Sequence, residues 1–185
     1  MQSYYFDTIT FSNFYFLDKL ESEYHPANLL AKGLRPKVSI FVIQEFFHAN
    51  IQKGEPERVF RLKNPADITQ SANDVIKYIS KFDIENVDEK WIQSRFYDLL
   101  VELESKINYS TKYIKNTKAD VPKIMDLFHL IVADELKCSY FLTFDREFEC
   151  LNNIGLNKFF TNLTEIKLLK EDTQRIPIDD LPIKI

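Results

Sequence analysis

Two short apolar runs, far apart in the chain, each end on an aspartate. Near the N-terminus, Tyr4, Tyr5 and Phe6 lead directly into Asp7. In residues 140–145 the run YFLTFD ends on Asp145 in the same way. Short runs of aromatic and branched residues are typical of strands buried on both faces, which occur mainly in parallel sheets. Both carboxylates are therefore predicted at the carboxyl ends of parallel strands, where such sheets bind ligands.

The rest of the sequence alternates between strand-like and helix-like segments. We expect strands at residues 3–7, at 37–43 with a turn into a helix near Ser39, and at 82–87, 140–145 and 165–170. We expect helices over 12–23, over the segment that carries Glu45, over 67–80 capped by Asp67, over about 88–107 capped by Asp88, and over 122–138. Residues 108–118 break the apolar rhythm and are predicted to form a loop. This alternation predicts an α/β fold with a mostly parallel sheet covered on both faces.

Composition excludes several classes of function. With three glycines the chain has no glycine-rich loop to hold a phosphate, which excludes P-loop and dinucleotide-binding proteins. Cys138 and Cys150 form no CxxC motif, so a zinc site or disulfide framework is not expected. A net charge of −4 argues against a generally basic surface for nucleic acid. No signal-peptide pattern or membrane-length apolar run is present, so we expect a cytoplasmic protein without membrane contacts.

Two further acids stand in apolar surroundings. Asp126 interrupts the run IMDLFHLI, and Glu45 lies within FVIQEFF. Because an unpaired carboxylate is costly to bury, buried acids are normally paired with a cation or bind a metal ion. Few basic residues occur in the same segments, which favours a cation from solution.

Each of these acids also has a purely structural interpretation. The two strand-end aspartates could cap the turns that follow their strands. Glu45 could lie on the exposed edge of its helix. Asp126 could pair with Lys123 or Lys137, or cap its own helix. His129, one turn after Asp126, is more often a core residue with satisfied hydrogen bonds than a metal ligand.

The order of these motifs along the chain resembles that of the PIN-domain nucleases, a family that includes the toxin ribonucleases of bacterial toxin–antitoxin pairs. The matching segments are Asp7-Thr8, Ser39 to Glu45, Asp126 to Ala133 and Thr143 to Phe148. The resemblance implies a three-layer α/β/α fold with a central, mostly parallel sheet. It also implies a single PIN-like domain over residues 1–185, with a helical elaboration at about 57–120.

The resemblance further implies an endoribonuclease that uses Mg²⁺ or Mn²⁺ to cut RNA phosphodiester bonds. The residues carried over as catalytic are Asp7, Glu45, Asp126, Asp145 and Thr143, with Thr143 orienting the last acid. The metal ligands would be the four acids together with Glu147. Mg²⁺ prefers carboxylate oxygens and keeps several waters, and such ions activate water for in-line displacement. The chain departs from the family at Ile9, where Asn or Ser is common, and at Leu127, where a small residue is common.

Candidate RNA contacts are the lysines of residues 108–118 and one arginine beside the acids. Lys112, Lys115 and Lys118 could hold phosphates, with tyrosines interleaved for stacking on bases. Arg146 is a second candidate for a phosphate contact. The lysines could equally form a solvated loop. We expect RNA as substrate, a homodimer, and an antitoxin-like protein partner if the toxin resemblance extends to biological role.

Two other functions compete with the nuclease hypothesis. Haloacid-dehalogenase-like phosphatases also begin with an aspartate at a strand end, but they need a second aspartate two residues later. That position is Ile9 here, which counts against a phosphatase. A PIN-like domain kept only as an interaction module is the second alternative, and the missing polar residue at position 9 leaves room for it.

Overall fold

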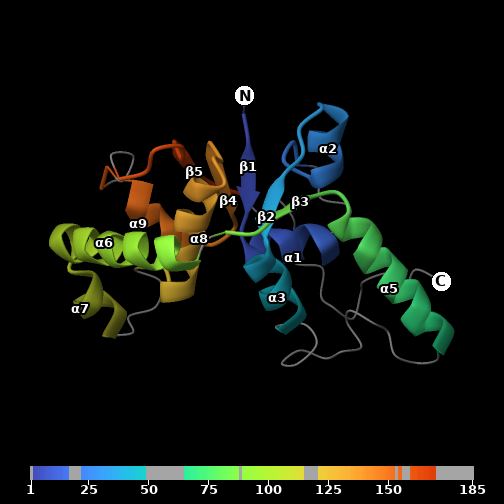
Figure 1. Cartoon of the computed structure of the whole chain (residues 1–185), viewed down its shortest axis with the longest axis horizontal. Helices are drawn as coiled ribbons and strands as arrows, with labels where there is room; N and C mark the ends of the chain where they lie inside the picture. The colour runs from blue at the N-terminus through green and yellow to red at the C-terminus, as the bar shows by residue number, and fades with distance from the viewer. Residues whose placement is uncertain are drawn as a thin grey trace.

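The computed structural model describes residues 2–16, 22–48, 65–87, 89–114, 121–152, 154–155 and 159–169. These residues form an α/β fold around a five-stranded parallel sheet with strand order β3-β2-β1-β4-β5 (Figure 1). The strands are β1 (Tyr4–Phe6), β2 (Lys37–Ser39), β3 (Asp83–Glu85), β4 (Tyr140–Thr143) and β5 (Glu165–Leu168). Each lies where the sequence predicts a strand, and the predicted α/β fold with a parallel sheet is confirmed.

Helices cover both faces of the sheet. They are α1 (Thr8–Phe16), α2 (Pro26–Ala31), α3 (Ile40–Phe47), α5 (Pro65–Ile79), α6 (Glu89–Ile107), α7 (Tyr109–Ile114), α8 (Ile124–Glu135) and α9 (Glu149–Asn152), with a short 3₁₀ turn, η2 (Arg146–Phe148). Figure 1 shows α6, α7, α8 and α9 on one side of the sheet and α1, α2 and α5 on the other. Among the described residues, no helix combines the length and apolar character that crossing a membrane requires.

The central strand β1 contributes fully buried side chains to both faces. Phe6 contacts Phe14 and Phe82 on the side of α1 and α5, with ring centroids 5.6 and 5.3 Å apart. Tyr5 stacks on Phe141 of β4 on the side of α8, at 5.7 Å. Such aromatic pairs add about 0.5–1.5 kcal/mol beyond the burial of apolar area. The core thus fixes β1 between two helical layers.

Two sequence predictions about helix boundaries are wrong. The first helix begins at Thr8 and not near residue 12, because Asp7 caps it by accepting a hydrogen bond from the Thr10 amide at 2.7 Å. The helix expected to start with Asp67 as its cap begins at Pro65, so residue 67 lies inside it. The cap predicted at residue 88 lies outside the described residues.

The loop predicted for residues 108–118 is wrong over Tyr109–Ile114, which form α7, and residues 115–118 lie outside the described residues. Asn108 has a positive φ of 51°, which asparagine tolerates better than most residues and which ends α6 before α7 begins. Tyr109 is buried and donates its hydroxyl hydrogen to the Pro122 carbonyl oxygen at 2.7 Å. Tertiary packing of this tyrosine therefore outweighs the weak local pattern.

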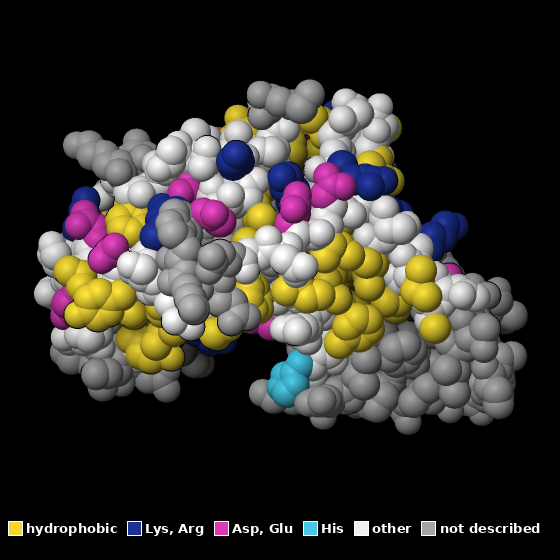
Figure 2. Space-filling model, viewed as in Figure 1, with side chains coloured by type: hydrophobic (Ala, Val, Ile, Leu, Met, Phe, Trp, Pro, Cys, Tyr) yellow, Lys and Arg dark blue, Asp and Glu magenta, His cyan; other side chains and the backbone are white. Residues whose placement is uncertain are grey.

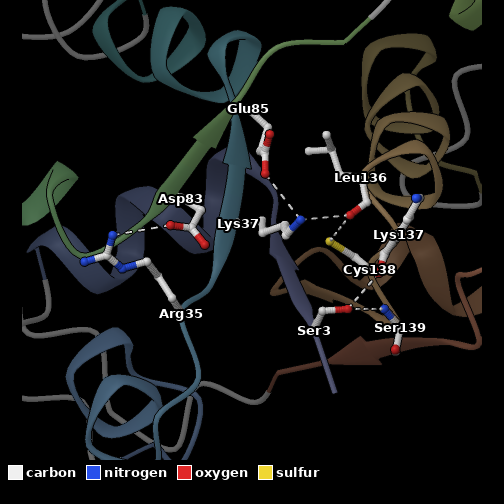
Figure 3. A network of polar contacts seen from close by, with 9 residues as sticks. All are labelled: Ser3, Arg35, Lys37, Asp83, Glu85, Leu136, Lys137, Cys138 and Ser139. Carbon is white, nitrogen blue, oxygen red and sulfur yellow. Dashed lines mark hydrogen bonds and ion pairs between the residues drawn. The ribbon is translucent and has the colours of Figure 1, made fainter. Parts of the chain in front are cut away.

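The C-terminal end of α8 is tied to the sheet by a polar network (Figure 3). Lys37 of β2 donates to the Leu136 carbonyl oxygen at 3.1 Å and to Glu85 of β3 at 3.3 Å. The Ser3 hydroxyl donates to the Lys137 carbonyl oxygen at 2.8 Å. A lysine at the C-terminal end of a helix satisfies free carbonyl groups and complements the helix dipole.

A buried ion pair on α8 was not singled out from the sequence. Asp134 is 1% exposed and accepts hydrogen bonds from Arg95 at 2.7 Å and from the backbone amides of Asn162 and Leu163 at 2.5 and 2.8 Å. Arg95 also donates to the Phe159 carbonyl oxygen at 3.3 Å. Asp134 therefore joins α6, α8 and the segment before β5, and its role is structural.

Replacing Arg95 by Met should lower the free energy of unfolding by about 3 kcal/mol, because it leaves the Asp134 carboxylate buried without its cation. The matched control is Arg35→Ala, which removes an ion pair to Asp83 whose side chains are 53% and 43% exposed and should change stability by less than about 1 kcal/mol. Urea unfolding measures both. Equal effects of the two substitutions would show that the Arg95–Asp134 pair does not join these elements.

Candidate metal centre

The candidate site lies at the carboxyl edge of the sheet. Because Phe6 pairs with Leu142, Asp7, which follows β1, and Thr143, the last residue of β4, lie at the same edge of the sheet. Asp145 follows two residues after Thr143, and the N-terminal turn of α8 carries Asp126. Thr143 also accepts a hydrogen bond from the Asp145 amide at 2.9 Å, which fixes the chain where it leaves β4.

Three carboxylates converge at this edge. One ligand atom from each of Asp126, Asp145 and Glu147 lies within 4.8 Å of the other two, and all three residues are partly buried. Asp126 Oδ2 accepts from the Lys123 amide at 3.2 Å, and Asp145 Oδ1 accepts from the Glu147 amide at 2.9 Å. Glu147 Oε2 is buried, and it has no hydrogen-bond partner among the described residues. This group is called the acid cluster below.

The electrostatics of the acid cluster are unfavourable without a cation. Burial raises the pKa of Asp126, and the negative charge of Asp145 raises it further. Burial and the charge of Asp145 raise the pKa of Glu147 in the same way. Three carboxylates with one buried, unpartnered oxygen match what a hard divalent cation requires, namely oxygen ligands and excess negative charge. The acid cluster could therefore hold a metal ion.

Asp7 lies at the same edge but belongs to no group of three metal-binding side chains among the described residues. Its side chain is buried, and burial raises its pKa from 3.8 to about 6, although hydrogen bonds from Thr143 and Thr10 oppose the shift. Thr143 therefore contacts both strand-end acids, Asp7 through its side chain and Asp145 through the backbone amide.

Glu45, on α3, also belongs to no such group among the described residues. Its Oε2 accepts hydrogen bonds from the Thr8 hydroxyl and from His129 Nε2, the latter at 3.0 Å. Burial raises the pKa of Glu45, but its contact with His129 and the Thr8 hydrogen bond outweigh burial and lower the pKa overall. Thr8 follows Asp7 directly, and His129 lies one helical turn after Asp126. Glu45 thus connects the start of α1, through Thr8, with α8, through His129.

The purely structural interpretations of the acids hold in part. Asp7 caps α1, Asp145 caps η2, and Asp126 accepts from the Lys123 amide at the start of α8. Glu45 is partly buried, with a side chain that is 32% exposed and hydrogen-bonded to buried His129. Capping does not exclude metal ligation, since a carboxylate can accept at both of its oxygens.

Two of the four predicted RNA contacts, Arg146 and Lys112, lie in the described part of the structure. Arg146 is exposed on η2, between two members of the acid cluster. Lys112 lies on α7 and is partly buried. Residues 115 and 118 lie outside the described residues.

An apolar surface next to the acid cluster was not predicted from the sequence. Ile124 and Met125, 39% and 51% exposed, directly precede Asp126, and Tyr113 on α7 is 42% exposed. A shallow cavity of about 460 Å³ is lined by Leu100, Val101, Glu104, Tyr109, Ser110, Tyr113 and Ile124. Figure 2 shows apolar side chains gathered over α6 and α7. The surface combines side chains from α6, α7 and α8, so no local sequence signal could have found it.

Comparisons with known proteins support the fold. No protein-family model and no curated protein matches the chain. Among solved structures, a chain in the crystal structure of VapBC2 from Rickettsia felis, bound to a DNA fragment from their promoter, matches with a TM-score of 0.54 at 18% identity. The match covers 91% of this chain and 100% of that chain. At this identity the similarity is one of fold.

Asp7→Asn should stabilise the metal-free protein at neutral pH. Between about pH 4 and 6 the folded state keeps a proton on Asp7 that the unfolded state releases, so this group lowers stability as pH rises, by about 3 kcal/mol in all. Asn removes the charge, and its side-chain oxygen can still accept from the Thr10 amide. We expect the free energy of unfolding of the variant to exceed that of wild type at pH 7.5. The two values should converge as the pH falls toward 4.

Urea unfolding in EDTA at several pH values measures this difference. Asp83→Asn, which changes an exposed carboxylate on β3, is the control and should show no comparable convergence. An Asp7→Asn variant that is less stable than wild type by the same amount at every pH would contradict the burial of an unfavourable charge.

Proposed function

We propose that the chain is a metal-dependent endoribonuclease of the PIN type that acts as the toxin of a toxin–antitoxin pair. The observation that carries the proposal is the acid cluster, with the buried, unpartnered Oε2 of Glu147, at the carboxyl edge of a parallel sheet. The shared fold with a chain of VapBC2 supports the same assignment. Residues of about 57–120 would be a helical elaboration of one domain, and β3 within them pairs with β2.

Asp126, Asp145 and Glu147 would hold Mg²⁺ or Mn²⁺, with Asp7 and Glu45 completing the negative charge around it. A bound ion of this kind lowers the pKa of a coordinated water and offsets the charge that develops on phosphate. Thr143 orients the acids at the ends of β1 and β4 through its contacts with Asp7 and Asp145. No covalent nucleophile is needed for this chemistry.

The RNA would contact cationic side chains around the acids. Arg146, exposed between Asp145 and Glu147, would bind a phosphate next to the scissile bond. Lys112, Lys115 and Lys118 would bind phosphates further along the strand. We also propose a homodimer and an antitoxin-like protein partner; the match to a chain of VapBC2 supports the proposed partner. A phosphatase is less well supported, because position 9 offers a partly exposed isoleucine where that chemistry needs an acid.

Purified protein should cut a mixed pool of single-stranded RNA in Mn²⁺ or Mg²⁺ and should not cut it in EDTA. Asp126→Asn should slow cleavage at least about 100-fold, because it removes a ligand from the acid cluster. Asp83→Asn is the matched control, since it changes an aspartate outside the acid cluster, and it should cut at the wild-type rate. Gel analysis of labelled RNA measures all three proteins.

Cleavage that persists in EDTA or in Asp126→Asn would contradict the proposal. Absence of cleavage together with absence of Mn²⁺ binding in calorimetry would instead favour a catalytically silent interaction module. Hydrolysis of phosphomonoesters, tested in parallel, would favour the phosphatase.

A further inference from the structure

A continuous chain of buried hydrogen bonds runs beneath the acids and ends on Glu45. The Ser39 and Tyr5 hydroxyls are 2.9 Å apart, and the Tyr5 hydroxyl is 2.9 Å from His129 Nδ1. His129 Nε2 is in turn 3.0 Å from Glu45 Oε2. Ser39, Tyr5 and His129 are at most 1% exposed. The hydrogen-bond chain therefore joins β2, β1, α8 and α3, and it is buried up to Glu45, whose side chain is 32% exposed.

The direction of the hydrogen bonds follows from the acid at the end. Ionised Glu45 can only accept, so His129 Nε2 must donate, and a neutral imidazole then accepts at Nδ1. Tyr5 donates to Nδ1, since burial raises its pKa well above the ordinary value and keeps the phenol protonated. Ser39 donates to Tyr5 while accepting from the Val42 amide at 3.4 Å. Every group in the hydrogen-bond chain is then satisfied.

This arrangement fixes one oxygen of Glu45 and leaves the other available. The hydrogen bonds from Thr8 and His129 both reach Oε2, and within the described part of the structure Oε1 accepts none. Both ring nitrogens of His129 are occupied, so His129 cannot itself be a metal ligand in this arrangement. A glutamate has several rotatable bonds, and two donors on one oxygen restrict its carboxylate to one orientation.

We propose that Tyr5 and His129 are positioning residues that orient Glu45 so that its Oε1 serves the metal centre. The inference rests on the proposed function, because it assigns these residues a task toward the bound cation. Partners behind a ligating group typically contribute 10- to 100-fold to metal affinity, roughly the effect expected here. A core histidine whose hydrogen bonds serve only the packing of the core would have no such effect on metal affinity.

The first test compares Mn²⁺ affinity by calorimetry for the wild-type chain and four variants. Tyr5→Phe and His129→Leu should each weaken binding about 10-fold or more. His129→Gln should recover part of that loss, because its amide can still donate to Glu45. Tyr78→Phe is the matched control. It removes another buried hydroxyl, which donates to the Phe11 carbonyl oxygen at 2.7 Å on the other side of the sheet, and its affinity should not change.

The second test determines which ring nitrogen of His129 carries the proton in the metal-free protein. Nitrogen NMR should show the tautomer with the proton on Nε2, and Tyr5→Phe should shift the Nδ1 resonance. The chain has three histidines, so assignment by substitution is practical. A proton on Nδ1 with a bare Nε2 would overturn the proposal, because no hydrogen bond to the Glu45 carboxylate could form.

The outcomes separate the two proposals. Wild-type Mn²⁺ binding that is unchanged in Tyr5→Phe and His129→Leu would overturn the positioning role and leave the proposed function intact. Absence of Mn²⁺ binding by the wild type would contradict the proposed function and this inference together. If His129→Leu fails to fold, Tyr5→Phe and His129→Gln still decide the question.

Discussion

The electrostatic cost of crowding carboxylates at one edge of a parallel sheet is the constraint on which the rest of the structure depends. Burial raises the pKa of Asp7 to about 6 even against the hydrogen bonds that lower it, and burial also raises the pKa values of Asp126 and Glu147. Hydrogen bonds from caps and hydroxyls offset part of this cost, but Glu147 Oε2 remains buried without a partner in the described structure. A divalent cation would offset the imbalance, and this supports the proposal of a metal centre.

The surrounding fold holds α8 in place so that the acids stay together. Lys37 binds the C-terminal end of this helix, and Arg95 pairs with Asp134 near the same end. At the other end Asp126 joins the acid cluster, and between them His129 reaches back to Glu45. One helix therefore carries a structural acid, a candidate ligand and the histidine that orients another acid.

Sequence patterns were sufficient for the parts governed by local chemistry. The strands before Asp7 and Asp145 and the buried helix around Asp126 follow from apolar runs, and all appear as expected. The sequence pattern gave a wrong prediction where contacts distant in sequence determine the local structure. One case is α7, which is stabilised by the buried Tyr109 hydroxyl. Likewise, no local signal shows that Asp134 pairs with Arg95, because the partners are 39 residues apart. The sequence predicted that five acids would gather around one ion, but it could not show that Asp126, Asp145 and Glu147 would be the three that lie closest together.

The most direct test of the metal centre is thermal unfolding of wild type and Glu147→Gln with and without Mn²⁺. Gln keeps the size of the side chain and removes its charge. The account predicts that Mn²⁺ raises the Tm of wild type, whereas the variant has a higher Tm than wild type in EDTA and responds little to the ion. If Mn²⁺ raised the Tm of the variant as much as it raises that of wild type, the result would contradict a metal centre at the acid cluster.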